Sequence, residues 1–403
     1  MERLVEKYAA KLRRAGACEA PLVAGQDDAV VWNGGADQAL AARFSPVVEG
    51  LGAAGFVLGR PAGPLGPIVD FLAAEYPGGL TPRDTETRTF LHFLPVAEDA
   101  SPGAVARALA GRRGALVPGL GFAARGAMTP EQAFVTYSSL CFACFVLFFS
   151  DHLRLAREGG LTPARREAFA RAVALLPPFI GQAAPRPELA RGPLETETRA
   201  LAAMAEAGRA VVDLGLVDSF FGNVSALVGG TVLISQTGSS LDELEGCVDP
   251  CPLPGGGRAS TASLTASSEL SAHLGAYAGE GGGPPRWRTI LHGHPRFTVV
   301  MSMDCPDSGG DPCEAGRQGR CHVACERARE LPGGAPIVPG EVGTGPTGLW
   351  RTLPLALARG GAAAVWGHGF FAAGEADFRA PLTAMIETEN ACRKRYFELL
   401  AGL

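Results

Sequence analysis

Lysine is almost missing from this chain of 403 residues, where it occurs only as Lys7, Lys11 and Lys394. An enzyme that activates a carbonyl group as a Schiff base needs a desolvated lysine in its pocket. None of the three lysines is close in sequence to the histidine motif LHGHP at 291–295. Carbonyl chemistry in this protein would therefore have to use a metal ion.

Runs of basic residues are also missing, and the formal net charge is −5. This balance argues against an electrostatic surface for nucleic acid or for anionic membranes and favours a small-molecule partner. Residues 1–17 have the spacing of an amphipathic helix and lack the apolar core of a signal peptide. We expect a cytoplasmic protein.

No apolar run reaches the roughly 20 residues of a membrane span. The most apolar stretch, 134–149, contains Thr136, Ser138 and Ser139 and is expected to be a buried helix. Without a signal peptide, the ten cysteines are not expected to form a secreted disulfide framework. Reduced thiols and metal ligands are the expected states.

The length allows two domains with separate cores. A proline-rich stretch at 175–193 lies between the halves, so we predict domains at 1–180 and 196–403 with a linker at 181–195. The second half predicts a mixed α/β domain, with a hairpin turning at Gly229-Gly230 and helices at 266–279 and 378–400.

The two halves share short matching segments, which indicates an internal duplication. RTFLHFLP at 88–95 matches RTILHGHP at 288–295, and GLGFAARG at 119–126 matches GHGFFAAG at 367–374. Both segments of each pair are expected to be strands. This alignment pairs His92 with His292, but places Leu94 at His294 and Leu120 at His368. The first half would therefore have lost two of three imidazoles and is not expected to bind metal.

A strand over 288–295 would place His292 and His294 on one face, with Cα atoms about 7 Å apart. His368 lies between two glycines at the end of another predicted strand and is the natural third ligand. Three histidines with an open position are typical of catalytic zinc. A single histidine is more often a core residue, but three in this pattern favour a metal site.

Glu269 is the candidate acid/base, since a carboxylate beside a divalent cation can ligate it and exchange protons. By itself, a glutamate at a helix start is usually a surface residue that complements the helix dipole. The segments GNVS (222–225), TGSS (237–240) and ASSE (266–269) offer hydroxyls and backbone N–H groups for phosphate or carboxylate oxygens. Each of them taken alone is more often an ordinary turn or cap.

These motifs together resemble the class II aldolase/adducin family, which includes fuculose-1-phosphate and rhamnulose-1-phosphate aldolases and ribulose-5-phosphate 4-epimerase. The resemblance runs from about residue 195 to 403. FFGNVS resembles the family's SGNxS, ISQTG its ITPTG, ASSE its SSE, HGHP its HTHP and WGHG its NHG.

The resemblance implies an α/β (α+β layered) domain with a central, mostly antiparallel sheet flanked by helices, preceded here by a degenerate copy. It implies Zn²⁺ or another divalent transition metal and reversible aldol cleavage of a small sugar or sugar phosphate through an enediolate. It also implies a cyclic oligomer, which for a duplicated chain predicts a dimer forming a pseudo-tetramer, or a tetramer. The implied metal ligands are His292, His294, His368 and Glu269, with Glu269 also the acid/base, and the implied substrate-binding residues are Asn223, Thr237, Gly238, Ser267 and Ser268.

The sequence departs from the family pattern at two places. Phe220 and Phe221 replace small or hydroxylated residues before GN, which allows an unphosphorylated or bulkier substrate, and Trp366 replaces a polar residue before HG. The same metal chemistry also serves an epimerase, dehydratase or decarboxylase. A non-catalytic scaffold, as in adducin, is the alternative from another class, and we would expect it to have lost the metal ligands.

A cysteine-rich segment at 304–327 contains Cys305, Cys313, Cys321 and Cys325. Four soft ligands in a loop with little apolar content predict a structural zinc or iron–sulfur site, with scattered reduced thiols and disulfides as alternatives. Cys247 and Cys251 could contribute. His273, one helical turn after Glu269, is expected to pack in the core or to support the ligands from behind rather than to be a ligand itself.

Overall fold

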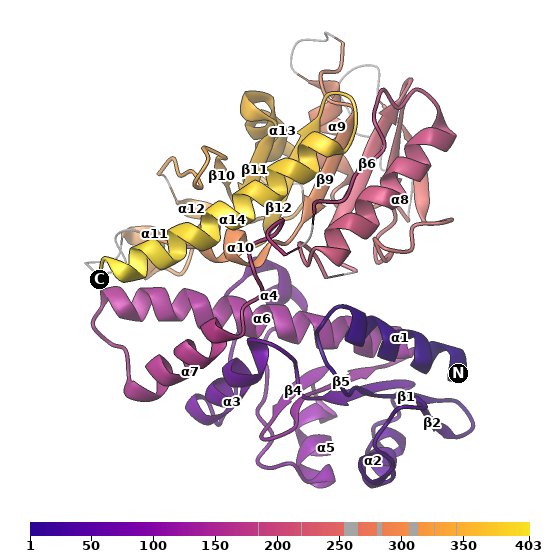
Figure 1. The fold of residues 1–403 in the computed structure, drawn as a ribbon, viewed down its shortest axis with the longest axis vertical. Helices are drawn as coiled ribbons and strands as arrows, with labels where there is room; N and C mark the ends of the chain where they lie inside the picture. Colours follow the sequence, from indigo (N-terminus) through magenta and orange to yellow (C-terminus); the bar gives the residue numbers. More distant parts are fainter. Residues whose placement is uncertain are drawn as a thin grey trace. The chain divides into compact units, whose positions relative to one another are not determined.

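The computed structural model describes residues 1–183, 185–218, 220–253, 265–279, 284–305, 313–325, 327–343 and 345–403. The chain divides into two compact units, Met1–Pro177 and Pro178–Leu403, and the division falls inside the proline-rich stretch. Figure 1 shows the strands and helices of both units.

The first unit contains one five-stranded antiparallel sheet of order β2-β1-β3-β5-β4. Aspartate, serine and threonine side chains cap the amino ends of five of its helices, α2 and α4 to α7. Its strands are β1 (Leu22–Gln26), β2 (Val30–Trp32), β3 (Gly55–Gly59), β4 (Gly114–Val117) and β5 (Gly121–Gly126), and its helices are α1 (Glu2–Arg14), α2 (Gln38–Leu51), α3 (Leu65–Glu75), α4 (Thr85–Leu91), α5 (Pro102–Ala110), α6 (Pro130–Arg157) and α7 (Pro163–Ala174).

Helix α6 is long and apolar enough to cross a membrane by composition, but 89% of its most apolar window is buried inside the protein. Its aromatic side chains pack within the unit, as in the stacked pair of Phe148 and Phe169. The predicted buried helix over 134–149 is thus confirmed, and it extends further at both ends.

The second unit contains a seven-stranded sheet of order β10-β11-β12-β9-β6-β7-β8, in which only the β10–β11 pair is parallel. The mostly antiparallel sheet flanked by helices is therefore confirmed. Its strands are β6 (Asn223–Val228), β7 (Thr231–Ser235), β8 (Val248–Pro252), β9 (Thr289–Gly293), β10 (Ile337–Val338), β11 (Ala362–Val365) and β12 (Gly369–Gly374), and its helices are α8 (Glu197–Asp213), α9 (Leu270–Ala278), α10 (Arg296–Ser302), α11 (Glu314–Arg317), α12 (Cys321–Ala324), α13 (Leu349–Gly360) and α14 (Arg379–Ala401).

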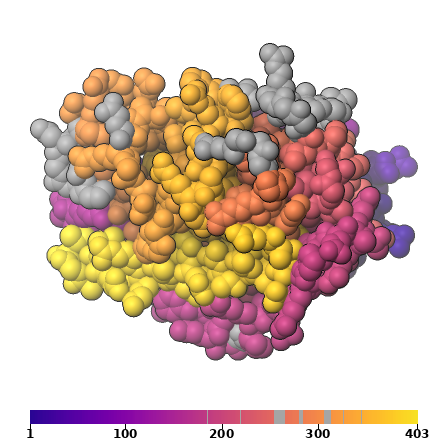
Figure 2. All heavy atoms as spheres, turned by 90° about the horizontal axis from the view of Figure 1, so that it is seen from above, coloured from indigo at the N-terminus to yellow at the C-terminus, as the bar shows by residue number. Residues whose placement is uncertain are grey.

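One face of this sheet packs against α9 and α13, whose apolar residues share a core cluster with Ile290 and Phe371. Side chains alternate along a strand, so His292 lies on the same face as Ile290. Leu291 and Gly293 point to the opposite face, where Met385 of α14 approaches Gly293. Helix α14 also borders the surface, where its residues form the yellow band of Figure 2. The amino end of α9 and the carboxyl end of β9 meet on the α9 face.

The two sheets share strand order and strand direction, since β2-β1-β3-β5-β4 corresponds to β7-β6-β9-β12-β11. This correspondence corrects the predicted alignment of the halves. Residues 88–91 belong to helix α4, which Asp84 caps by accepting from the Thr87 amide, and are not a strand. The counterpart of β9 is β3, which pairs with β1 and β5 as β9 pairs with β6 and β12.

The strand registers then identify the residues of the first unit that stand where the histidines stand in the second. With Gly126 matched to Gly374, Leu58 corresponds to His292 and Arg60 to His294. His92 and Leu94 are not the counterparts. Leu120 keeps its predicted correspondence to His368, and Arg60 forms an ion pair with Asp70 instead of facing a metal site.

Candidate metal centre

His292 and His294 project from the end of β9, as the strand prediction required. His292 is the penultimate residue of the strand and His294 follows its last residue, and both are buried. Their Nε2 atoms lie 3.1 Å apart. The His292 ring stacks on Phe371 with centroids 3.7 Å apart, and its Nδ1 lies 3.1 Å from the Phe370 carbonyl oxygen. This backbone acceptor fixes the tautomer that leaves the Nε2 lone pair available.

His368 comes from the turn between β11 and β12 and brings its Nε2 to 3.2 Å from His292 Nε2. The Ser302 hydroxyl accepts from the Gly367 amide and holds this turn in place. Gly369 follows directly, and a Cβ atom there would lie 2.6 Å from His292 Cε1 and 2.7 Å from His294 Cδ2. Only glycine therefore leaves room for the two rings at this position.

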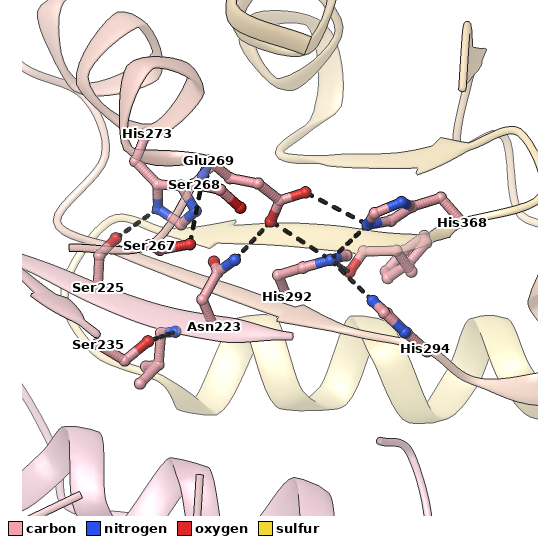
Figure 3. A network of polar contacts seen from close by, with 12 residues as sticks. Asn223, Ser225, Ser235, Ser267, Ser268, Glu269, His273, His292, His294 and His368 are labelled. Carbon is pink, nitrogen blue, oxygen red and sulfur yellow. Dashed lines mark hydrogen bonds and ion pairs between the residues drawn. The ribbon is translucent and has the colours of Figure 1, made fainter. Parts of the chain in front are cut away.

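Glu269 precedes the first residue of α9 and points toward the histidines (Figure 3). Its Oε1 lies 3.3 Å from His368 Nε2, and its Oε2 lies 3.5 Å from His292 Nε2. The Asn223 side-chain amide donates to Oε2 at 2.5 Å. Gly222 allows this approach, because it has a positive φ of 73° and a Cβ there would lie 2.4 Å from the His292 carbonyl oxygen.

The electrostatics of this cluster fit a bound cation. Burial lowers the pKa of His292 to about 4 and that of His294 well below its usual value, so both rings are neutral at pH 7. Burial alone would raise the pKa of Glu269, but the adjacent His292 and His368 rings outweigh it and lower that pKa. A carboxylate buried among neutral imidazoles needs a positive partner.

The geometry fits a divalent transition metal in particular. In the described part of the chain, the three histidines are the one group in which three potential ligand atoms all lie within 4.8 Å of one another. Tetrahedral coordination at 2.0–2.1 Å separates ligand nitrogens by roughly 3.3 Å. The observed separations of 3.1 and 3.2 Å are close to that value.

The predicted substrate-binding residues lie beside this cluster. Thr237 Oγ1 accepts from the Ser268 amide, and Ser267 Oγ accepts from the Glu269 amide at 3.3 Å. Gly238 has a positive φ of 70° and completes the turn. These bonds tie the turn after β7 to the start of α9. Phe221 lies next to His294, with their ring centroids 5.6 Å apart.

A buried polar chain behind Glu269 was not predicted. Ser225 Oγ lies 2.7 Å from His273 Nδ1 and 2.8 Å from Tyr277 Oη, and all three residues are buried. His273 is thus hydrogen-bonded in the core, as expected for a residue that is not a ligand. Ser225 follows Asn223 by two residues on the same strand face, so strand alternation was the signal that could have identified it.

The cysteine-rich segment differs from the histidine cluster. Cys305, Cys313, Cys321 and Cys325 form no disulfide within the described part of the chain, and none of them is fully buried. Burial, followed by the other three thiols of the segment, raises the pKa of Cys321, so the four groups lie near one another. They do not converge to metal-binding distances among the described residues. Residues 306–312 lie outside that part of the chain.

Comparison with known proteins gives one family for the second unit. The model of the class II aldolase and adducin N-terminal domain matches residues 202–396. L-fuculose-1-phosphate aldolase from Thermus thermophilus is 23% identical over 51% of this chain and 97% of its own, with a TM-score of 0.38. YgbL from Klebsiella pneumoniae is 23% identical over 50% of this chain and 90% of its own, with a TM-score of 0.35. A sugar-phosphate aldolase from Thermotoga maritima is 16% identical over 51% of this chain and 96% of its own, with a TM-score of 0.34. No curated protein matches the sequence.

Proposed function

Because residues 202–396 form a class II aldolase/adducin domain, we propose that the second unit is a metal-dependent lyase that cleaves or forms a C–C bond in a small sugar or sugar phosphate. The observation that carries this proposal is the convergence of three buried imidazoles and one carboxylate at the end of β9. A scaffold protein has no need for a buried polar cluster of this kind, which destabilises the fold unless a cation occupies it.

His292, His294 and His368 would hold the metal ion through their Nε2 atoms. A divalent cation bound there would polarise a substrate carbonyl and stabilise the negative charge that develops on oxygen during C–C cleavage. Zinc, manganese, cobalt and iron all suit this donor set.

Glu269 would ligate the ion at rest and move the proton during reaction. The amide of Asn223 orients the carboxylate, and the short bond between them favours its ionised form. The backbone amide of Glu269 donates to the Ser267 hydroxyl, so the Glu269 carboxylate is held at a fixed point beside the His292 and His368 rings. A group that exchanges protons at a reacting carbon must be fixed in this way.

The substrate would lie between the turn after β7 and Phe221. Ser268, Thr237 and the turn at Gly238 present hydroxyl and amide groups to it, with no lysine or arginine among the proposed contacts. The aromatic ring of Phe221 beside His294 favours a substrate with an apolar or unphosphorylated part on that side.

The test compares wild type with His294→Ala and Glu269→Gln, using His92→Ala as a control because His92 is exposed in the first unit. We expect metal in the wild type, in Glu269→Gln and in the control, but not in His294→Ala. Aldol cleavage, screened with sugars and sugar phosphates, should fall at least ~100-fold in Glu269→Gln. Wild-type protein without metal would refute the lyase and favour a scaffold, whereas turnover that inverts a centre without C–C cleavage would indicate an epimerase.

The first unit is proposed to be a copy of the same fold without a metal site. The shared strand order supports this, as do Leu58, Arg60 and Leu120 at the positions of the three histidines. Two chains would then supply four such domains in a dimer. Light scattering that gives a monomer or a four-chain ring would contradict this arrangement. The cytoplasmic location and the thiolate metal site remain predictions.

A further inference from the structure

A cavity of about 470 Å³ in the first unit is lined by arginines and aromatic rings, far in sequence from the histidine cluster. Its walls come from the end of α4 and the turn after it, from the start of β4 and from the end of β5. The lining residues include Arg112, Arg113 and Arg125 and, among the described residues, no aspartate or glutamate. In a protein of net charge −5, this is a local concentration of positive charge.

The three guanidinium groups have no carboxylate partners among the described residues. Arg125 donates through Nε to the Arg112 carbonyl oxygen at 2.9 Å, which fixes the direction of its side chain. The Arg112 guanidinium lies over the Phe93 ring, 5.8 Å from its centroid. Arg107 of nearby helix α5 behaves differently, since it pairs with Glu98. Guanidinium groups around one cavity that face no carboxylate are suited to binding an oxyanion.

The backbone of the cavity wall is strained at His92. This residue has φ 54° and ψ −58°, and it is the one non-glycine residue of the described chain with a positive φ. The Phe93 amide donates to the Leu91 carbonyl oxygen at 2.5 Å, so His92 is the central residue of a γ-turn in its strained form. Strain of this kind persists where the surrounding structure imposes it, and it is concentrated at ligand sites. Here the Leu80–Leu94 bridge holds Leu94, two residues after His92.

We propose that this cavity binds a phosphate-bearing small molecule, with Arg113 and Arg125 as the donors to the phosphate. The cavity is larger than a phosphate ion, so the remainder of the ligand would contact Phe90 and Phe93. Such a site would give the first unit a binding role that does not depend on the metal centre of the second.

The experiment is equilibrium dialysis of inorganic phosphate and of phenyl phosphate against the full-length protein at constant ionic strength set with sodium chloride. We expect saturable binding of one phosphate per chain, with phenyl phosphate bound more tightly because of its ring. Arg113→Ala should weaken binding at least tenfold. Arg113 is exposed, so this variant should fold, and circular dichroism would verify it.

Two controls separate this site from other anion sites. Arg107→Ala removes an arginine outside the cavity and should bind phosphate like wild type. His294→Ala removes the candidate metal centre and should also leave this binding unchanged. Equal loss in Arg107→Ala and Arg113→Ala, loss in His294→Ala, or no saturable binding at all would overturn the proposal.

Discussion

Gly369→Ala should remove metal binding without altering any metal ligand. The added Cβ would lie 2.6 Å from His292 Cε1, 2.7 Å from His294 Cδ2 and 2.6 Å from the Gly293 carbonyl oxygen. Ordinary carbon contacts begin near 3.5 Å, so the two rings must move by about 1 Å. Metal–ligand distances tolerate a deviation of only about 0.2 Å. The rings therefore cannot avoid the added Cβ and still stay within metal-binding distance.

The magnitude follows from this displacement. Changes that misplace a ligand without deleting it typically weaken metal affinity by about 10–100-fold, and overpacking of a rigid core costs about 1–3 kcal/mol. We expect effects of that size in a competitive chelator titration and in urea unfolding. Gly230→Ala is the matched control, because a Cβ at the tip of the β6–β7 hairpin meets nothing within 4 Å. Metal affinity of Gly369→Ala equal to wild type would refute the placement of the histidine rings.

Three further predictions concern the surroundings of the site. Glu389→Ala removes the carboxylate that accepts from two backbone amides at the start of α10, at 2.9 and 2.8 Å, and should lower the unfolding free energy by about 1–3 kcal/mol in urea. Ser225→Ala deprives buried His273 of its hydrogen bond and should cost a similar amount while leaving metal content unchanged; loss of metal would show that Ser225 orders the site itself. Burial tends to raise the pKa of Asp377, but hydrogen bonds from Arg379 and backbone amides lower it overall. The stabilisation that Asp377 contributes is therefore present above the unfolded-state pKa near 4 and is lost as pH falls through the lower folded-state pKa. Asp377→Asn should therefore flatten the acid limb of the stability curve, and an unchanged limb would contradict this role.

The elements of the second unit were predictable where the chain carries strong local signals. Gly229-Gly230 specify the hairpin turn, and the short apolar run with β-branched Thr289 and Ile290 specifies β9. Spacing alone placed His292 and His294 on one face, but the position of His368 beside them depends on strand pairing between β9 and β12, which sequence spacing does not report.

The error at 88–95 has a physical cause. Thr89 and the aromatic residues Phe90 and Phe93 favour a strand, yet the local capping signal at Asp84 starts a helix. The true counterpart of β9 is the fully buried β3, which carries no histidine and so offered no motif to match. The cavity at His92 depends on a backbone conformation that composition does not predict.

Leu58 and Leu120 of the first unit occupy the positions of His292 and His368 in the second, which allows the stability of the two sheets to be compared. Leu58 belongs to the core of the first unit and Leu120 packs against that core, at positions where the second unit buries imidazoles. The strands therefore form without the histidines, and the first unit shows this sheet with leucine in place of two buried imidazoles. The buried histidines lower the stability of their own domain unless a cation occupies the cluster, and leucine at the same positions of the first unit avoids this cost.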